Sequence, residues 1–222
     1  MKPPALAWIT VSLAFVMVLM LAGHSSAAGD QENTDRFGHQ ALPTDQLEKE
    51  HEVTLKMADA ADQMAAKLRA GEEVSRERLA DMYDFFINFV DACHHGKEEQ
   101  YYFPVALIAK PDLAATVKTL ELQHDIGKSL ISGIGRSLDI WNESPETARR
   151  EAADDLTAYA SLLRRHIDLE SGAFMKAAEA AFSPEQRSLV RAGFHYVEAE
   201  QLGEGFHEKY HNLAMKLLNN AK

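Results

Sequence analysis

The sequence is poor in cysteine and in basic residues. Cys93 is its one cysteine, so no disulfide can form within the chain. Lys and Arg together number 23 against 34 Asp and Glu, which gives a formal net charge of −11. An acidic surface repels nucleic acid and anionic membranes, so we expect neither as a partner. The sequence also contains no glycine-rich phosphate loop, no Ser/His/Asp arrangement beyond chance and no paired cysteines, so none of these motifs points to its function.

Long apolar runs are absent except at the N-terminus. Residues 5–22 carry no charge and follow Lys2, and the small residues Ser-Ala-Ala end at Ala28. This pattern predicts a secretory signal peptide over residues 1–28, cut near Ala28. The run is also about long enough to cross a bilayer, so an uncleaved N-terminal anchor is the alternative. In both cases we expect an exported, periplasmic protein, and without disulfides its stability must come from a core or a bound metal.

Beyond the N-terminus the patterns are helical, and we find no strand. Residues 29–43 are polar and aperiodic, which indicates a linker. Residues 44–182 contain four long helical patterns with short connections, which predict an up-down-up-down four-helix bundle. The segment "SPEQ" at 183–186 has the residues of a capping box and predicts one further helix over 183–222. We therefore expect an all-α fold with an additional C-terminal helix.

A weak internal repeat runs through the four helical patterns. "LEKEHE" (47–52) and "LELQHD" (120–125) each contain a lone histidine, His51 and His124. A His-x-x-x-Glu pair follows each of them, at His94–Glu98 and His166–Glu170. The lone histidine precedes its pair by 43 positions in the first copy and by 42 in the second. Each half of the predicted bundle therefore supplies the same three side chains in the same order.

The spacing of each pair has a geometric consequence. Residues four apart on an α-helix lie about 40° apart around its axis, so the histidine and the glutamate point at one spot. Facing helices of a bundle bring such spots together in the core, where uncompensated carboxylates cost several kcal/mol each. Two divalent or trivalent cations would balance that charge. Mixed imidazole and carboxylate ligands suit iron, manganese or zinc.

Two segments resemble a known family. "CHHGKEEQYYFP" (93–104) and "RRHIDLES" (164–171) are similar to the His-x-x-x-Glu segments of the hemerythrin-like, HHE cation-binding family, and the resemblance covers about residues 44–182. It implies two non-haem iron ions, with manganese or zinc as alternatives, bridged by the two glutamates. The implied metal ligands are His51, His94, Glu98, His124, His166 and Glu170.

Alternatives remain open on the second helix. His95 and Glu99 share the four-residue spacing of His94 and Glu98, although an α-helix would turn them about 100° away. The oxygen-carrying hemerythrins place a further histidine where this chain has Lys128. The resemblance therefore implies four imidazoles and two carboxylates, which puts reversible oxygen carriage in doubt and favours redox chemistry.

Other polar residues have several interpretations. Glu200 and His207 lie on the polar stripe of the C-terminal helix, which either faces solvent or reaches the metals. Glu50, Glu52 and Asp125 flank the lone histidines and are candidate acceptors for imidazole N–H groups.

Three functional hypotheses follow. The first is an exported di-iron protein that binds or senses dioxygen, nitric oxide or iron. The second is a di-iron redox enzyme that reduces nitric oxide or peroxide and protects against oxidative stress. The third is a structural helical bundle without metal. The sequence names no electron donor and no oligomeric state.

Overall fold

The computed structural model describes residues 42–219. Helices make up most of these residues and no strand occurs among them, so the all-α prediction is confirmed. The predicted signal peptide (1–28) and nearly all of the predicted linker (29–43) lie outside the described residues. No helix between residues 42 and 219 has both the length and the apolar character needed to cross a membrane.

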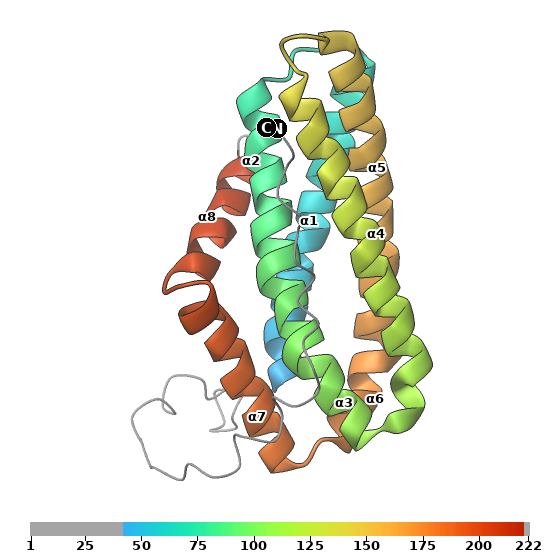
Figure 1. Cartoon of the computed structure of the whole chain (residues 1–222), viewed down its shortest axis with the longest axis vertical. Coiled ribbons are helices and arrows are strands. Elements are labelled where there is room, and N and C mark those ends of the chain that lie inside the picture. The colour runs from blue at the N-terminus through green and yellow to red at the C-terminus, as the bar shows by residue number, and fades with distance from the viewer. Residues whose placement is uncertain (1–41, 220–222) are drawn as a thin grey trace, which may run out of the picture. The chain divides into compact units, whose positions relative to one another are not determined.

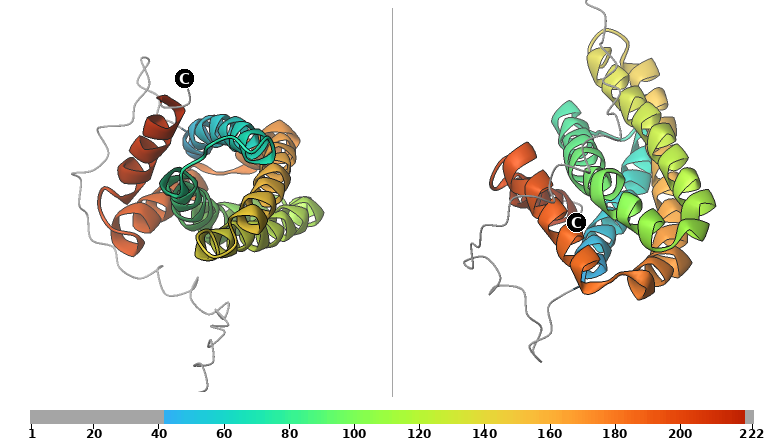
Figure 2. Two further views of the ribbon diagram at one scale, coloured as in Figure 1. Left: turned by 90° about the horizontal axis from the view of Figure 1, so that it is seen from above. Right: turned by 60° about the horizontal axis from the view of Figure 1, so that its bottom comes forward.

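Four helical stretches precede the C-terminal region. The first is α1 (Pro43–Arg69), and the second is α2 (Arg76–Phe85), which continues through η2 (Phe86–His95), η3 (Glu98–Tyr102) and α3 (Phe103–Ala109). The third consists of η4 (Pro111–Leu113) and α4 (Ala114–Asp139). The fourth is α5 (Pro145–Leu169), which continues through η5 (Glu170–Phe174) and α6 (Met175–Ala181). Segments η2, η3 and η5 are π-helical. Figure 1 shows consecutive stretches running in opposite directions, and Figure 2, in the view from above, shows the four stretches side by side around a common axis. Within it, α5 packs against both α1 and α4.

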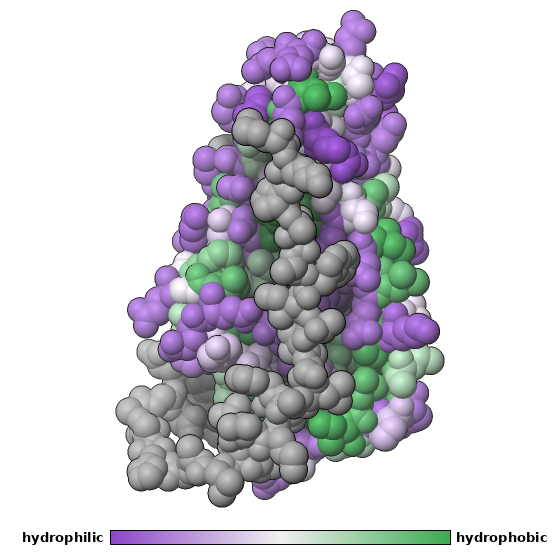
Figure 3. All heavy atoms as spheres, viewed as in Figure 1, coloured by the Kyte–Doolittle hydropathy of each residue, from purple (hydrophilic) through white to green (hydrophobic). Residues whose placement is uncertain are grey.

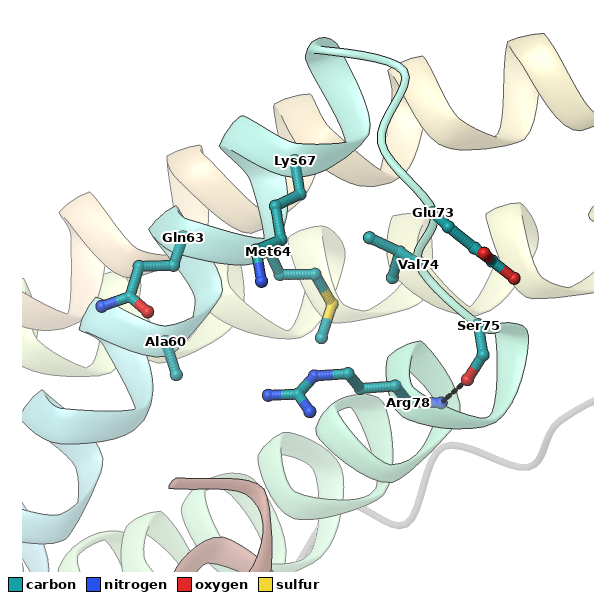
Figure 4. Close-up of a pocket in the computed structure, with 8 residues that line it drawn as sticks. All are labelled: Ala60, Gln63, Met64, Lys67, Glu73, Val74, Ser75 and Arg78. Atoms are coloured by element: carbon teal, nitrogen blue, oxygen red, sulfur yellow. Dashed lines mark hydrogen bonds between the residues drawn. The ribbon is translucent and has the colours of Figure 1, made fainter. Parts of the chain in front are cut away.

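Serine and proline residues mark the helix starts. The side chain of Ser75 accepts a hydrogen bond from the backbone three residues later (Figure 4). Ser183 does the same, and the Gln186 side chain accepts from the Ser183 backbone, which completes the predicted capping box. Ser144 makes no such bond, so at that start Pro145 provides the signal through its restricted φ.

The prediction of a single helix over 183–222 is wrong. The structure has two helices there: α7 (Pro184–His195), which continues through π-helical η6 (Tyr196–Gln201), and α8 (Phe206–Asn219). A turn over 202–205 separates them. Gly203 and Gly205 in this turn have φ of 101° and 77°, a region that residues with a Cβ rarely enter. The turn lets α8 pack against α2 and α1 at one side of the bundle (Figures 1 and 2).

The apolar core has two parts with a polar layer between them. One cluster, which includes Met57, Phe86 and Leu156, fills the bundle toward the α1–α2 connection. The other, which includes Leu47 and Phe174, fills the opposite end. Buried histidine and glutamate side chains occupy the positions between these clusters on each helix. The flanking apolar layers remove water from this polar layer, which strengthens every charge interaction within it.

The surface offers two other features. On the face shown in Figure 3, apolar side chains gather along α3 and α4, where Ile108, Leu122 and Ile126 are exposed. The pocket drawn in Figure 4 lies between α1 and the start of α2, and Met64 and Lys67 contribute to its lining. None of the predicted metal ligands lines this pocket, so the buried polar layer is a separate site.

Candidate metal centre

All six predicted ligands lie in the buried polar layer. Each is at most 3% exposed, although each comes from a different helical segment. In chain order the segments and residues are α1 with His51, η2 with His94, η3 with Glu98, α4 with His124, α5 with His166 and η5 with Glu170. The structure therefore brings the two copies of the repeat together in one place.

Four of these residues form a first group, which we name the His94 group (His51, His94, Glu98 and Glu170). Nε2 of His94 lies 3.0 Å from Oε1 of Glu98. Nε2 of His51 lies 3.8 Å from that same oxygen and 3.3 Å from Oε2 of Glu170. One ligand atom from each of the four lies within 4.8 Å of the others, a spacing compatible with one shared metal ion.

A second group, the His124 group, consists of His95, Glu98, His124 and His166. Nε2 of His124 lies 3.4 Å from Oε2 of Glu98 and 3.3 Å from Nε2 of His166. Glu98 thus belongs to both groups, with one oxygen directed toward each. Oε2 of Glu170 also lies 3.2 Å from Nε2 of His166. Both glutamates therefore stand between the two groups, where bridging ligands would have to be.

His95 adds a fifth imidazole to the cluster. Its side chain is buried, and its ring stacks on that of His124 with 3.8 Å between the centroids. From the sequence, His94 with Glu98 and His95 with Glu99 are alternative pairs of ligands. In the structure both histidines lie in the cluster. The reason is that η2 is π-helical: a π turn contains more residues than an α turn, so adjacent side chains diverge less. Glu99 stays outside the cluster, which holds five imidazoles, one more than the four that the resemblance implies as ligands.

The outward-facing ring nitrogens of the histidines have partners of their own. Nδ1 of His51 lies 2.8 Å from Oγ of Ser171. Nδ1 of His94 donates to Glu50 over 2.8 Å, and Nδ1 of His124 donates to Glu99 over the same distance. Nδ1 of His166 donates to the side-chain oxygen of Gln123 over 3.0 Å. Such partners hold each ring in one orientation and leave its Nε2 directed inward. Of the three candidate acceptors that flank the lone histidines, only Glu50 has this role, because Glu52 and Asp125 are exposed.

The site attracts positive charge strongly. Burial alone would raise the pKa of the Glu98 carboxyl, but the neighbouring His94 and His124 lower it well below its usual range. Burial opposes a charge on His94, yet Glu98 and Glu50 raise its pKa to about 10. Burial likewise opposes a charge on His124, and its carboxylate partners raise its pKa to about 9. The two buried carboxylates therefore favour positive charge on the groups beside them.

The inward-facing atoms test whether metal ions fit. Among the residues that the structure describes, the buried atoms without a hydrogen-bond partner include Nε2 of His51 and His94 and all four carboxylate oxygens of Glu98 and Glu170. A buried polar atom without a partner costs about 1–3 kcal/mol, and more when it carries charge. Cations among these atoms would satisfy them together, and the donor set is one that iron, manganese and zinc accept.

Comparison with known families agrees with this geometry. The model of the hemerythrin HHE cation-binding domain matches residues 42–178. The chain belongs to the hemerythrin HHE cation-binding family. The family domain contains all five clustered histidines and both glutamates, whereas α7, η6 and α8 lie beyond it. No curated protein and no solved structure matches the chain.

The sequence left open whether Glu200 or His207 reaches the metals, and it singled out Lys128. Glu200 is exposed, and His207 does not enter the cluster. Nδ1 of His207 instead lies 3.8 Å from Cys93 Sγ and 3.3 Å from Glu198 Oε1. Lys128, at the position of the extra histidine in the oxygen carriers, pairs with Glu99 at 3.2 Å. The sequence did not single out Glu198, whose contacts depend on how the C-terminal helices fold back.

Proposed function

We propose that the HHE domain holds two iron ions and uses them to bind or sense a small diatomic molecule, dioxygen or nitric oxide. The observation that carries the proposal is the buried cluster itself. Five imidazoles and two carboxylates face one another there. The inward atoms of His51, His94, Glu98 and Glu170 have no hydrogen-bond partner, while outer partners hold four of the imidazoles in place. In a purely structural bundle, two buried carboxylates without hydrogen bonds would lower the stability with no compensating gain.

Each side chain has a distinct role in this proposal. His51 and His94 would hold one ion, and His95, His124 and His166 the other, with Glu98 and Glu170 shared. A bound di-iron centre supplies reversible one-electron chemistry and a coordination position for a diatomic ligand. The ring of Phe103 lies parallel to His124 at 5.8 Å and closes the cluster on the side of the second apolar core. This apolar wall excludes water and favours a small, uncharged ligand.

The number of imidazoles bears on the choice between binding and catalysis. The four imidazole ligands that the sequence implies would favour redox chemistry over simple binding. His95 supplies a fifth from a neighbouring position, so the absence of a histidine at position 128 no longer disfavours reversible binding. We therefore place the binding or sensing function first, and a di-iron oxidoreductase that reduces nitric oxide or peroxide second.

Metal loading is the first test. The full chain is loaded with Fe(II) without air, desalted, and its metal content and optical spectrum are measured. We expect two irons per chain and absorption from a bridged di-iron centre after oxidation. Manganese and zinc loading under the same conditions test the identity of the metal. A stably folded chain that retains no metal would overturn the proposal and leave the structural bundle.

Reaction with gases separates the two functions. The reduced, iron-loaded chain is mixed rapidly with dioxygen or with nitric oxide while the spectrum is followed. A stable adduct that reverses when the gas is removed supports binding or sensing. Rapid and irreversible oxidation, with turnover when a reductant is supplied, would support the enzyme instead.

We also propose that the domain works outside the cytoplasm, on the basis of the signal-peptide pattern over residues 1–28. Cell fractionation and the mass of the purified chain test this. We expect the periplasmic form to begin near residue 29. Full-length chain confined to the cytoplasm would contradict the proposal.

A further inference from the structure

Lys97 is a fully buried cation beside the HHE cluster. It lies in the second helical stretch between η2 and η3, with its side chain 0% exposed. Its Nζ donates to Glu50 of α1 in a very close contact and to Oε1 of Glu198 in η6 over 2.8 Å. An ammonium group is stable in such a place only with carboxylate partners, because burial removes its water. Lys97 therefore depends on two helices that are far apart in the sequence.

Glu50 connects this lysine to the metal cluster. One of its oxygens accepts from Lys97, and the other accepts from Nδ1 of His94 over 2.8 Å. Gln46 spans the two carboxylates, with its Nε2 at 3.3 Å from Glu50 and 2.7 Å from Glu198. We name these four residues, Gln46, Glu50, Lys97 and Glu198, the Lys97 network. It forms a continuous path of hydrogen bonds from the C-terminal helices to a candidate ligand.

Another interpretation of this region is a third cation site. Ligand-type atoms of Cys93, Glu198 and His207 lie within 4.8 Å of one another. However, Oε1 of Glu198 already accepts hydrogen bonds from Lys97 and from Gln46. A metal ion bound there would lie beside the Lys97 ammonium and be repelled by it. Lys97 is thus the cation that this cluster of acceptors holds.

The network crosses the boundary of the family domain. The HHE match ends at residue 178, whereas Glu198 belongs to η6. Lys97 also lies 5.7 Å from the centre of the Phe194 ring in α7. The C-terminal helices therefore contribute both a carboxylate and an aromatic face to the residue that supports Glu50.

We propose that the Lys97 network is a positioning device, through which the C-terminal helices hold the His94 imidazole in the orientation that a metal ion in the His94 group requires. This inference rests on the proposed metal-binding function. Glu50 accepts the Nδ1 hydrogen of His94 and so keeps Nε2 as the inward ligand atom, while Lys97 keeps the Glu50 carboxylate in place. Lys97, Glu50 and Glu198 act only through His94.

Substitution of Lys97 tests the proposal. Full-length chains carrying Lys97→Met or Glu198→Gln are loaded with Fe(II) or Co(II), and the release of metal to a chelator is followed together with the optical spectrum. For Lys97→Met we expect one of the two ions to leave about 10 times faster. This is the lower end of the 10–100-fold loss of affinity that follows removal of a ligand's outer partner, because Lys97 acts on His94 through Glu50. The spectrum of that ion should change, while the other ion is released at the wild-type rate. Glu198→Gln should show a smaller change in the same ion.

Two further variants separate positioning from general stability. Lys216→Met removes a surface contact between α8 and Asp81, at 3.2 Å, and is the matched control for a lost contact of the C-terminal helices. It should release both ions at the wild-type rate. The double variant Glu50→Gln/Lys97→Met removes both charges of the fully buried pair. Glu198 is 24% exposed and keeps Gln46 as a donor, so this variant should melt near the wild-type temperature. It should nevertheless release one ion faster, because an amide holds the His94 ring less firmly than a carboxylate.

The outcomes distinguish this inference from the proposed function. A wild-type chain that binds no metal overturns both. A wild-type chain that binds two ions, with Lys97→Met and the double variant retaining both as Lys216→Met does, overturns the positioning role alone. A third outcome is that Lys97→Met releases one ion faster but the double variant releases it at the wild-type rate. Lys97 would then serve only stability, which would also overturn the positioning role.

Discussion

His94 and His124 are held in the same way but in different surroundings. Each donates from Nδ1 to a glutamate over 2.8 Å, to Glu50 and Glu99 respectively. Each glutamate in turn pairs with a lysine, Lys97 or Lys128. Lys97 and Glu50 are 0% and 3% exposed, whereas Lys128 and Glu99 are 41% and 35% exposed.

Exposure to water decides how much each ion pair contributes to the stability of the fold. Burial alone would raise the pKa of Glu50, but Lys97 and His94 lower it to about 2. The pKa of Glu99 is lowered too, although solvent screens the Lys128 contact. The same arrangement of histidine, carboxylate and lysine is therefore buried on one side of the cluster and open to solvent on the other, so we expect it to hold His94 more firmly than His124.

The largest expected effect comes from Glu98, the carboxylate that the two groups share. Glu98→Ala should abolish retention of both ions, because each group loses an oxygen ligand. Metal analysis after desalting measures this, and Glu52→Ala, at an exposed position in α1, is the control. Retention of one ion by Glu98→Ala would show that the two groups do not depend on a common ligand.

His95 belongs to the His124 group alone. His95→Ala should therefore lower retention to one ion per chain and leave the spectrum of the His94 group unchanged. Metal content and spectrum together check this. Retention of two ions at wild-type affinity would show that the buried His95 ring only packs against His124 and is no ligand.

The Lys97 pair should outweigh the Lys128 pair in stability. Lys97→Met leaves the Glu50 charge buried without its main partner, and breaking a buried pair in this way costs about 3–5 kcal/mol. Urea unfolding of the metal-free chain measures the change in free energy of unfolding. Because the double variant Glu50→Gln/Lys97→Met removes both charges, it should recover most of the loss. A change below about 1 kcal/mol in Lys97→Met would contradict the contrast between the two pairs.

The smallest effect is expected for Lys128→Met. An ion pair this exposed contributes about 0–1 kcal/mol, and salt reduces it further. The difference in urea stability between Lys128→Met and the wild type should therefore shrink in 1 M salt, whereas the effect of Lys97→Met should persist. A large, salt-independent loss in Lys128→Met would show that Glu99 supports His124 as firmly as Glu50 supports His94.

Much of the fold followed from local chemistry. Helix starts at Ser75 and Ser183 were recognisable because capping depends on residues only three positions apart. The repeat predicts one buried layer for the lone histidines and the His-x-x-x-Glu pairs. Matched positions in the two halves set the layer, and the spacing of four brings each histidine to the same side of its helix as its glutamate. Gly203 and Gly205 mark the break before α8, but glycine is also tolerated inside helices, so the sequence alone predicts one continuous helix there.

What the sequence by itself determined is the all-α fold of residues 42–219 and the meeting of six polar side chains in its core. Both depend on periodicity and short-range spacing. The tertiary structure alone decided that His95 joins the cluster, because the π-helical turn of η2 changes the angle between neighbouring residues. It alone also decided that Lys97 meets Glu198, because that contact joins residues about a hundred positions apart and exists only once the C-terminal helices pack against the bundle.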